Sequence, residues 1–132
     1  MKKKLLLLVL AVLSVFGSYA QWQLDFCAGD SAETCIGKSD IFYWNGETVT
    51  IYLIVSHTDS IGTSKLQYRV YDMIGEKSGE IYADLKVHAR PAWKRVWKKL
   101  YFVKPGYYKV EVYNERAQLL TSGFVTITDR RD

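Results

Sequence analysis

Residues 102–112 read Phe-Val-Lys-Pro-Gly-Tyr-Tyr-Lys-Val-Glu-Val, and this stretch decides the fold of the chain. Pro105 and Gly106 suit the centre of a type II turn, because proline fixes φ and glycine accepts a positive φ. The residues that follow, up to Asn114, alternate in polarity. One face of this alternation holds Tyr108, Val110 and Val112. A period of two predicts a strand with one buried face that starts directly after a tight turn.

The same alternation recurs along most of the chain. It is clearest at 48–56, where one face consists of Val49, Ile51, Leu53 and Val55. Further strands are expected at 22–26, 39–44, 65–72, 81–87, 96–102 and 119–128. The ten tyrosines, four tryptophans and five phenylalanines also favour strands over helices. About seven short strands at regular spacing in one chain predict an all-β fold, an antiparallel β-sandwich.

The 102–112 stretch resembles the penultimate-loop region of immunoglobulin-like and fibronectin-type-III-like domains. In those domains an apolar residue, a Pro-Gly turn and a tyrosine lead into the strand before the last. The turn at 45–47, before the 48–56 strand, is similar to the entry into their second strand. The resemblance implies an Ig-like sandwich in which Tyr107 or Tyr108 is a corner tyrosine, bonded through its hydroxyl to nearby backbone. It implies a fold and not a function.

Residues 1–20 have the layout of a secretory signal peptide. Three lysines follow Met1, an apolar run covers 5–16, and the small-x-small sequence Ser-Tyr-Ala ends at Ala20. We expect cleavage after Ala20, which leaves 21–132 as a single exported domain in the periplasm or outside the cell. The mature chain would hold no membrane span, since the apolar run is too short for one and is removed. A signal peptide followed by such a sandwich looks like exported proteins of Bacteroidota-type bacteria.

Cys27 and Cys35 are the two cysteines of the chain and lie eight positions apart. In an exported protein such a pair predicts a local disulfide. A zinc site would need further ligands at suitable spacing, and a redox site would more typically be Cys-x-x-Cys. The pair is also too close in sequence to join opposite sheets, as the cysteines of antibody domains do.

The sequence favours no catalytic site. His57, Asp59 and Ser60 share one loop, whereas hydrolase triads are assembled from separated segments. Acidic residues near the cysteines match no calcium motif, and the mature chain has no phosphate-binding glycine loop. We therefore expect a protein that is not an enzyme and holds neither a metal nor a cofactor.

The charge of the chain is uneven. The formal net charge is +4, but without 1–20 it falls to about +1, so basicity gives no argument for nucleic-acid binding. Residues 21–84 carry a net charge of −6 and residues 85–132 carry +7. The stretch 85–110 contains eight Lys or Arg and no carboxylate. Two interpretations stay open: compensation across neighbouring strands, or a basic face directed at an anionic partner.

The segment 93–101 is the candidate binding site. Its apolar residues fit a helical stripe, but the period of two elsewhere favours a strand with Val96, Leu100 and Phe102 inward. Aromatic side chains would then point outward with lysines beside them, a surface suited to sugar rings and anionic groups. The candidate residues are Trp93, Lys94, Trp97, Lys98 and Tyr101. The competing interpretation is that a bulge turns Trp97 into the core.

These observations lead to one functional hypothesis and one alternative. The first is an exported, non-catalytic binding module that engages an anionic glycan or a protein of the cell envelope through the 93–101 face. The alternative is a secreted inhibitor, for example of a protease, that presents the loop 56–65.

Overall fold

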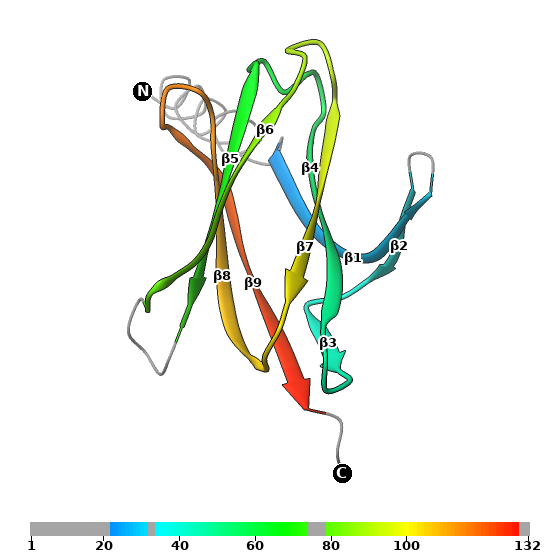
Figure 1. Ribbon diagram of the computed structural model, residues 1–132. Coiled ribbons are helices and arrows are strands. Elements are labelled where there is room, and N and C mark those ends of the chain that lie inside the picture. Colours follow the sequence, from blue (N-terminus) through cyan, green and yellow to red (C-terminus); the bar gives the residue numbers. More distant parts are fainter. Residues whose placement is uncertain (1–21, 32–33, 74–78, 130–132) are drawn as a thin grey trace, which may run out of the picture.

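The computed structural model describes residues 22–31, 34–73 and 79–129 and places them in two β-sheets packed face to face (Figure 1). Its strands are β1 (Trp22–Ser31), β2 (Thr34–Lys38), β3 (Ile41–Trp44), β4 (Val49–His57), β5 (Lys65–Asp72), β6 (Ile81–His88), β7 (Arg95–Phe102), β8 (Gly106–Tyr113) and β9 (Leu119–Asp129). One sheet has the order β2-β1-β4-β7 and the other β3-β9-β8-β5-β6. All pairs are antiparallel except β3 with β9. The predicted all-β sandwich is confirmed, with more strands than expected.

The expected signal peptide and its cleavage site at Ala20 lie outside the described residues. Within the described residues there is no helix of the length and apolarity that a membrane crossing requires.

The cysteine segment differs from the loop that its polar composition suggested. β1 pairs with β4 as far as Cys27, and from Cys27 to Ser31 it pairs with β2 in a hairpin that leaves the body of the sandwich (Figure 1). The predicted disulfide between Cys27 and Cys35 is present, with the two Cα atoms 5.6 Å apart. The cross-link and the β1–β2 ladder thus restrain the same hairpin.

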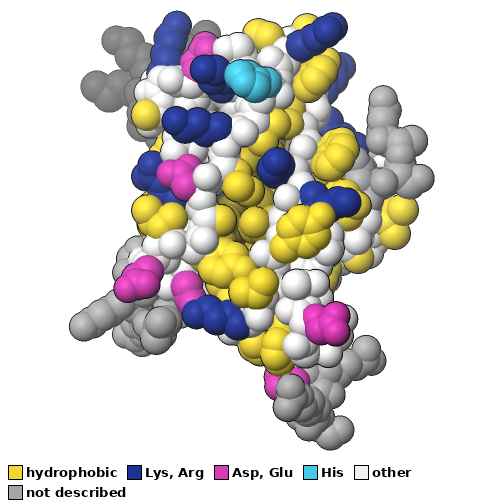
Figure 2. All heavy atoms as spheres, viewed as in Figure 1, with side chains coloured by type: hydrophobic (Ala, Val, Ile, Leu, Met, Phe, Trp, Pro, Cys, Tyr) yellow, Lys and Arg dark blue, Asp and Glu magenta, His cyan; other side chains and the backbone are white. Residues whose placement is uncertain are grey.

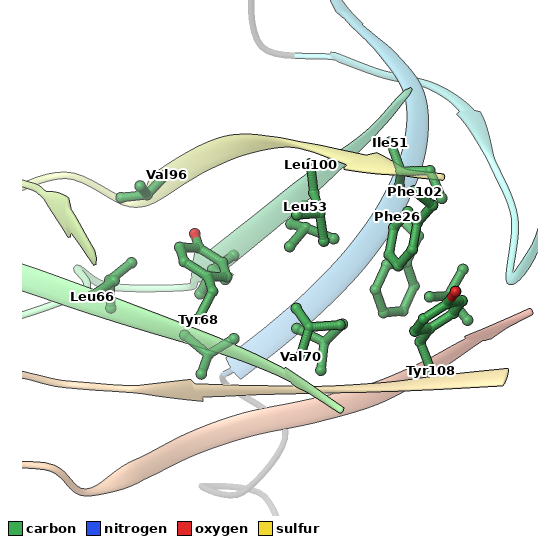
Figure 3. Packing of buried hydrophobic residues seen from close by; sticks show 14 of the residues in the cluster. Phe26, Ile51, Leu53, Leu66, Tyr68, Val70, Val96, Leu100, Phe102 and Tyr108 are labelled. Carbon is green, nitrogen blue, oxygen red and sulfur yellow. The ribbon is translucent and has the colours of Figure 1, made fainter. Parts of the chain in front are cut away.

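The core consists of the inward residues of both sheets, as the alternation predicted (Figure 3). Fully buried members of it are Ile51, Leu53, Val55, Leu66, Tyr68, Val70, Phe102, Tyr108, Val110 and Val112. At the start of β6 the alignment expected from sequence is wrong. The register between β5 and β6 shifts after Val70, and Ile81 lies exposed while the Tyr82 ring stacks on Phe102 at 5.4 Å.

The turn before β8 confirms the corner tyrosine and corrects the role of its glycine. The Tyr108 hydroxyl donates a hydrogen bond of 2.9 Å to the carbonyl of Lys104. Gly106 has no positive φ, so the type II turn expected there is not the reason for a glycine. A Cβ at Gly106 would instead lie 3.2 Å from the Tyr108 ring. Glycine is needed because the buried ring passes directly against the backbone.

The two buried tyrosines of the core differ in their polar ends. Tyr68 extends from β5 across the core toward the opposite sheet (Figure 3), and its hydroxyl has no hydrogen-bond partner among the described residues. Burial raises the pKa of Tyr68, because the ionised phenolate would lose its hydration.

Candidate aromatic-basic binding face

β7 forms one edge of the four-stranded sheet and, among the described residues, pairs only with β4. Its alternation is regular. Val96, Leu100 and Phe102 are buried, whereas Trp97 is 50% and Tyr101 55% exposed. The strand interpretation of this segment is therefore confirmed, and no bulge turns Trp97 into the core.

Two residues that the sequence did not single out complete this face. Tyr52 of β4 is opposite Lys99 in the ladder, and its ring lies 5.7 Å from the Trp97 ring between centroids. The Lys99 ammonium lies 5.4 Å from the centre of the Tyr52 ring. We call Tyr52, Trp97, Lys99 and Tyr101 the aromatic-basic face. The alternation of 48–56 already placed Tyr52 on the outer side, but only the pairing of β4 with β7 brings it to Trp97.

Lys98 lies on the other side of the strand from its predicted companions. It is opposite the buried Leu53 and between Val96 and Leu100, so its side chain starts on the face that points between the sheets. Because β7 is an edge strand, the long lysine stem can cover apolar surface there while the ammonium reaches water at the open side of the sandwich. Lys99, not Lys98, accompanies Trp97.

Trp93 and Lys94 precede β7 in the turn that connects it to β6. Trp93 is 44% exposed, and its carbonyl accepts a 2.7 Å hydrogen bond from the amide of Ile61. The turn borders a groove of about 860 Å³ where the ends of β4, β6 and β7 meet. The groove is lined by His57, Val87, His88, Trp93, Lys94 and Trp97, among others. Trp97 is the predicted residue that belongs to both the groove and the aromatic-basic face.

Hydrophobic side chains line the open side between β6 and β7, at the centre of the view in Figure 2, and most Lys and Arg side chains of this view lie toward its upper end. Part of the basic stretch is compensated. Lys104, in the turn before β8, pairs with Asp72 of β5 at 2.9 Å, as the interpretation of compensation between neighbouring strands predicted, whereas Lys109 pairs at 3.9 Å with Glu111 of its own strand. The hydrogen bond from Lys104 to Asp72 raises the pKa of that lysine. Other cations make no ion pair with any described residue; these are Lys86, Arg90, Lys94, Lys98 and Lys99. The uncompensated charge thus gathers around β7.

The loop that contains His57, Asp59 and Ser60 is organised by backbone contacts. Nδ1 of His57 accepts hydrogen bonds from the amides of Asp59 and Ser60, at 3.1 and 3.3 Å. These bonds place Nδ1 against backbone and not against the Ser60 hydroxyl. No group of three potential metal ligands occurs within the described residues.

The loop proposed as an inhibitory segment is held against the domain. Ile61 and Thr63 are buried, and Thr63 accepts a hydrogen bond from the amide of Glu115. The amide of Gly62 donates to the carbonyl of Pro91. The centre of the loop therefore packs inward and does not protrude as an exposed strip of chain.

Comparison with known proteins supports the fold. An immunoglobulin-like protein from Pseudomonas aeruginosa superposes with a TM-score of 0.51 and 11% identity, covering 80% of this chain and 92% of that one. The soluble domain of PmoD from Methylocystis gives 0.48 and 14%, over 81% and 90%. A β-glucosidase from Listeria innocua gives 0.41 and 17%, over 81% of this chain but 16% of that one. No protein-family model and no curated protein matches the chain.

The structural likeness establishes an Ig-like fold, as the resemblance of 102–112 implied, and at these identities it establishes the fold alone. The β-glucosidase match spans a small part of a much longer protein and says nothing about glycosidase activity here. The Cys27–Cys35 disulfide is consistent with a periplasmic or extracellular location, where such bonds persist.

Proposed function

We propose that this protein is an exported, non-catalytic binding module that holds an anionic glycan on its aromatic-basic face. The observation that carries the proposal is the exposure of Trp97 and Tyr101 on one strand, with Tyr52 and Lys99, which has no ion pair among the described residues, between and beside them. Large aromatic side chains that already face water contribute little to the stability of the fold. They can contribute much to binding free energy when a flat apolar partner covers them.

The spacing of the face suits an extended chain of sugars. Trp97 and Tyr101 are four residues apart on one strand, which corresponds to roughly 13 Å. A sugar ring stacked on Trp97 and a second sugar ring stacked on Tyr101 would therefore be different units of one polysaccharide. Lys99 lies between the two positions and is placed to pair with a carboxylate, sulfate or phosphate group on the sugar between them.

The experiment compares glycans that differ in charge. The protein, purified after export, is titrated with polygalacturonate, a sulfated polysaccharide and neutral dextran by calorimetry. We expect binding to the two anionic polymers that weakens with added salt, and none to dextran. The double variant Trp97→Ala/Tyr101→Ala should lose this binding while keeping the wild-type thermal unfolding curve.

The opposite sheet offers a matched control. Tyr107 and Phe124 stack on each other at 5.2 Å, and they are 45% and 44% exposed, close to the values for Trp97 and Tyr101. Tyr107→Ala/Phe124→Ala removes a comparable aromatic pair from the other outer face and should leave glycan binding intact. Equal loss in both double variants, or binding of dextran as strong as that of polygalacturonate, would overturn the proposal.

The cation is tested in the same way. Lys99 lies over Tyr52, and Lys109 lies over Phe124 at 5.8 Å, so each lysine covers an aromatic ring on its own outer face, and Lys109 also pairs with Glu111. Lys99→Ala should weaken binding of polygalacturonate several-fold and reduce its salt dependence, whereas Lys109→Ala should change neither. Export itself is tested by N-terminal sequencing of the purified protein, which should begin at Gln21.

The inhibitor alternative finds no support in the geometry of loop 56–65. Protein inhibitors that act through a loop present exposed side chains to the partner. Here the central Ile61 is 3% exposed, and the backbone of the loop is bonded to the 90–94 turn.

A further inference from the structure

The backbone of β7 has a free edge as well as an outer face. In an antiparallel strand the N–H and C=O of one residue point to the same side, and successive residues alternate between the two sides. The Lys94 carbonyl accepts from His57 of β4, so even-numbered residues direct their backbone groups toward β4. The odd-numbered residues Trp97 and Lys99 therefore direct theirs away from the sheet, and no described residue pairs with them.

Tyr82 marks where this free edge ends. Its hydroxyl donates a 3.0 Å hydrogen bond to the carbonyl of Tyr101 and accepts one of 3.1 Å from the amide of Val103. These two bonds confirm the parity, because both groups belong to odd-numbered residues. They also give hydrogen-bond partners to the Tyr101 carbonyl and the Val103 amide at the end of the strand. The unpaired backbone groups of the described edge are therefore those around Trp97 and Lys99.

Unpaired edges tend to pair with another strand, and charge decides which strands are accepted. Lys98 and Lys99 have no ion pair with described residues, and Lys94 lies at the start of the same edge. If two copies of β7 were paired, these lysines would face each other, and like charges on neighbouring strands are destabilising. An inward-pointing lysine such as Lys98 is a known device against such self-pairing. An acidic strand would meet the same lysines as complementary charges.

We propose that the free edge of β7 accepts an extended, acidic segment of a partner protein as an added strand next to Trp97 and Lys99. In this binding mode main-chain hydrogen bonds supply affinity and alternate side chains supply specificity. Side chains of the added strand that point between the sheets would lie beside Val87 and Val96 in the groove at the start of β7. Acidic side chains on the outer side of the added strand would reach Lys99. The edge lies in the plane of the sheet and the aromatic-basic face lies above it, so strand addition uses the backbone of β7 and not its aromatic rings, although both proposals use the Lys99 ammonium.

The test uses amide hydrogen exchange of the whole exported protein, measured by NMR. The probe is a short synthetic peptide of alternating valine and glutamate, and the control is the corresponding peptide of valine and lysine. We expect the acidic peptide to slow exchange of the Trp97 and Lys99 amides at least ten-fold at saturation. The Lys98 amide, which points to β4, is an internal reference and should not change. The basic peptide should have no effect.

A pair of variants separates the backbone from the charge. Lys99→Ala removes the ammonium but keeps the amide, and Lys99→Pro removes both. Lys99→Pro should abolish binding of the acidic peptide, and Lys99→Ala should only weaken it. If the proline variant does not fold, a second probe tests the same hydrogen bonds on the wild-type protein. This probe is the acidic peptide with N-methyl groups on every second residue, and it should not bind.

Three results would overturn the inference: binding of the acidic peptide without slower exchange at Trp97 and Lys99, equal binding by the proline and alanine variants, or unchanged binding of the N-methylated peptide. The variant Trp97→Ala/Tyr101→Ala distinguishes the two proposals, because it retains the backbone edge. It should still bind the acidic peptide although it has lost polygalacturonate. Polygalacturonate that slows the Trp97 and Lys99 amides as the peptide does would also contradict strand addition.

Discussion

The two faces of β7 carry similar residues in opposite surroundings. Phe102 is completely buried between the sheets and contacts the Tyr108 ring at 4.6 Å, while Trp97 and Tyr101 on the other face are about half exposed. A single strand thus carries aromatic side chains that hold the domain together and aromatic side chains that leave its stability nearly untouched. Alternation along the strand, and not residue type, decides which is which. The predictions below compare the two sides in unfolding measurements.

The largest effect is expected from truncation of the buried face. Phe102→Ala removes a ring packed against Tyr82 and Tyr108 and should lower the free energy of unfolding by about 3–5 kcal/mol. Urea denaturation followed by tryptophan fluorescence measures this change. Tyr101→Ala, one position away on the same strand, is the control and should cost less than about 1 kcal/mol. Similar losses in both would mean that the two faces do not differ as described.

The disulfide is expected to contribute the next largest effect; it joins β1 to β2, and its Cys27 is opposite Tyr52 of β4 in the ladder. Replacing Cys27 and Cys35 by serine should lower the free energy of unfolding by about 2.5 kcal/mol, because the cross-link restricts the unfolded chain. Mass spectrometry of the exported wild-type protein should find both thiols oxidised, and two free thiols would contradict this assignment.

A smaller contrast lies within the buried face itself. Tyr108→Phe removes the hydrogen bond to Lys104 and should lower the free energy of unfolding by about 1–2 kcal/mol. Tyr68→Phe removes a buried hydroxyl that has no described partner, and it should be neutral or stabilising by up to about 1 kcal/mol. If Tyr68→Phe were as costly as Tyr108→Phe, a partner for the Tyr68 hydroxyl would have to exist.

The same two tyrosines predict sensitivity to alkali. Burial is the main cause that raises the pKa of both side chains above the ordinary tyrosine value. Above about pH 10 the unfolded chain therefore releases protons that the folded chain still binds, and the free energy of unfolding falls as the pH rises. Urea titrations between neutral pH and about pH 11 measure this slope. The slope should be shallower in Tyr68→Phe, and an unchanged slope would argue against the burial of that phenol.

Alternation along one strand predicted the buried residues of β4, β5 and β8 and the inward and outward aromatic residues of β7, but not the exposure of Ile81 in β6. The resemblance of 102–112 to Ig-like domains implied a corner tyrosine at Tyr107 or Tyr108, and the structure shows that it is Tyr108. Sequence alone could not predict contacts that arise when strands pair. Tyr52 became part of the binding face only through the register of β4 with β7. The β1–β2 hairpin was missed because its glycine, serine and acidic residues have low strand propensity, and pairing with β4 and the cross-link override that preference. The assignment of Lys98 to the outer face was an error of parity that the alternation rule itself corrects.

The smallest effect on stability, and the largest on binding, is expected from Trp93→Ala combined with Trp97→Ala. The two indole rings are 44% and 50% exposed, so their loss should change the free energy of unfolding by less than about 1 kcal/mol. Binding of polygalacturonate should nevertheless disappear, because Trp97 is the ring shared by the aromatic-basic face and the groove. Circular dichroism and urea denaturation check the fold, and calorimetry checks the binding. If the double variant unfolds, the tryptophans support the domain from outside, and the division of β7 into a structural and a recognition face fails.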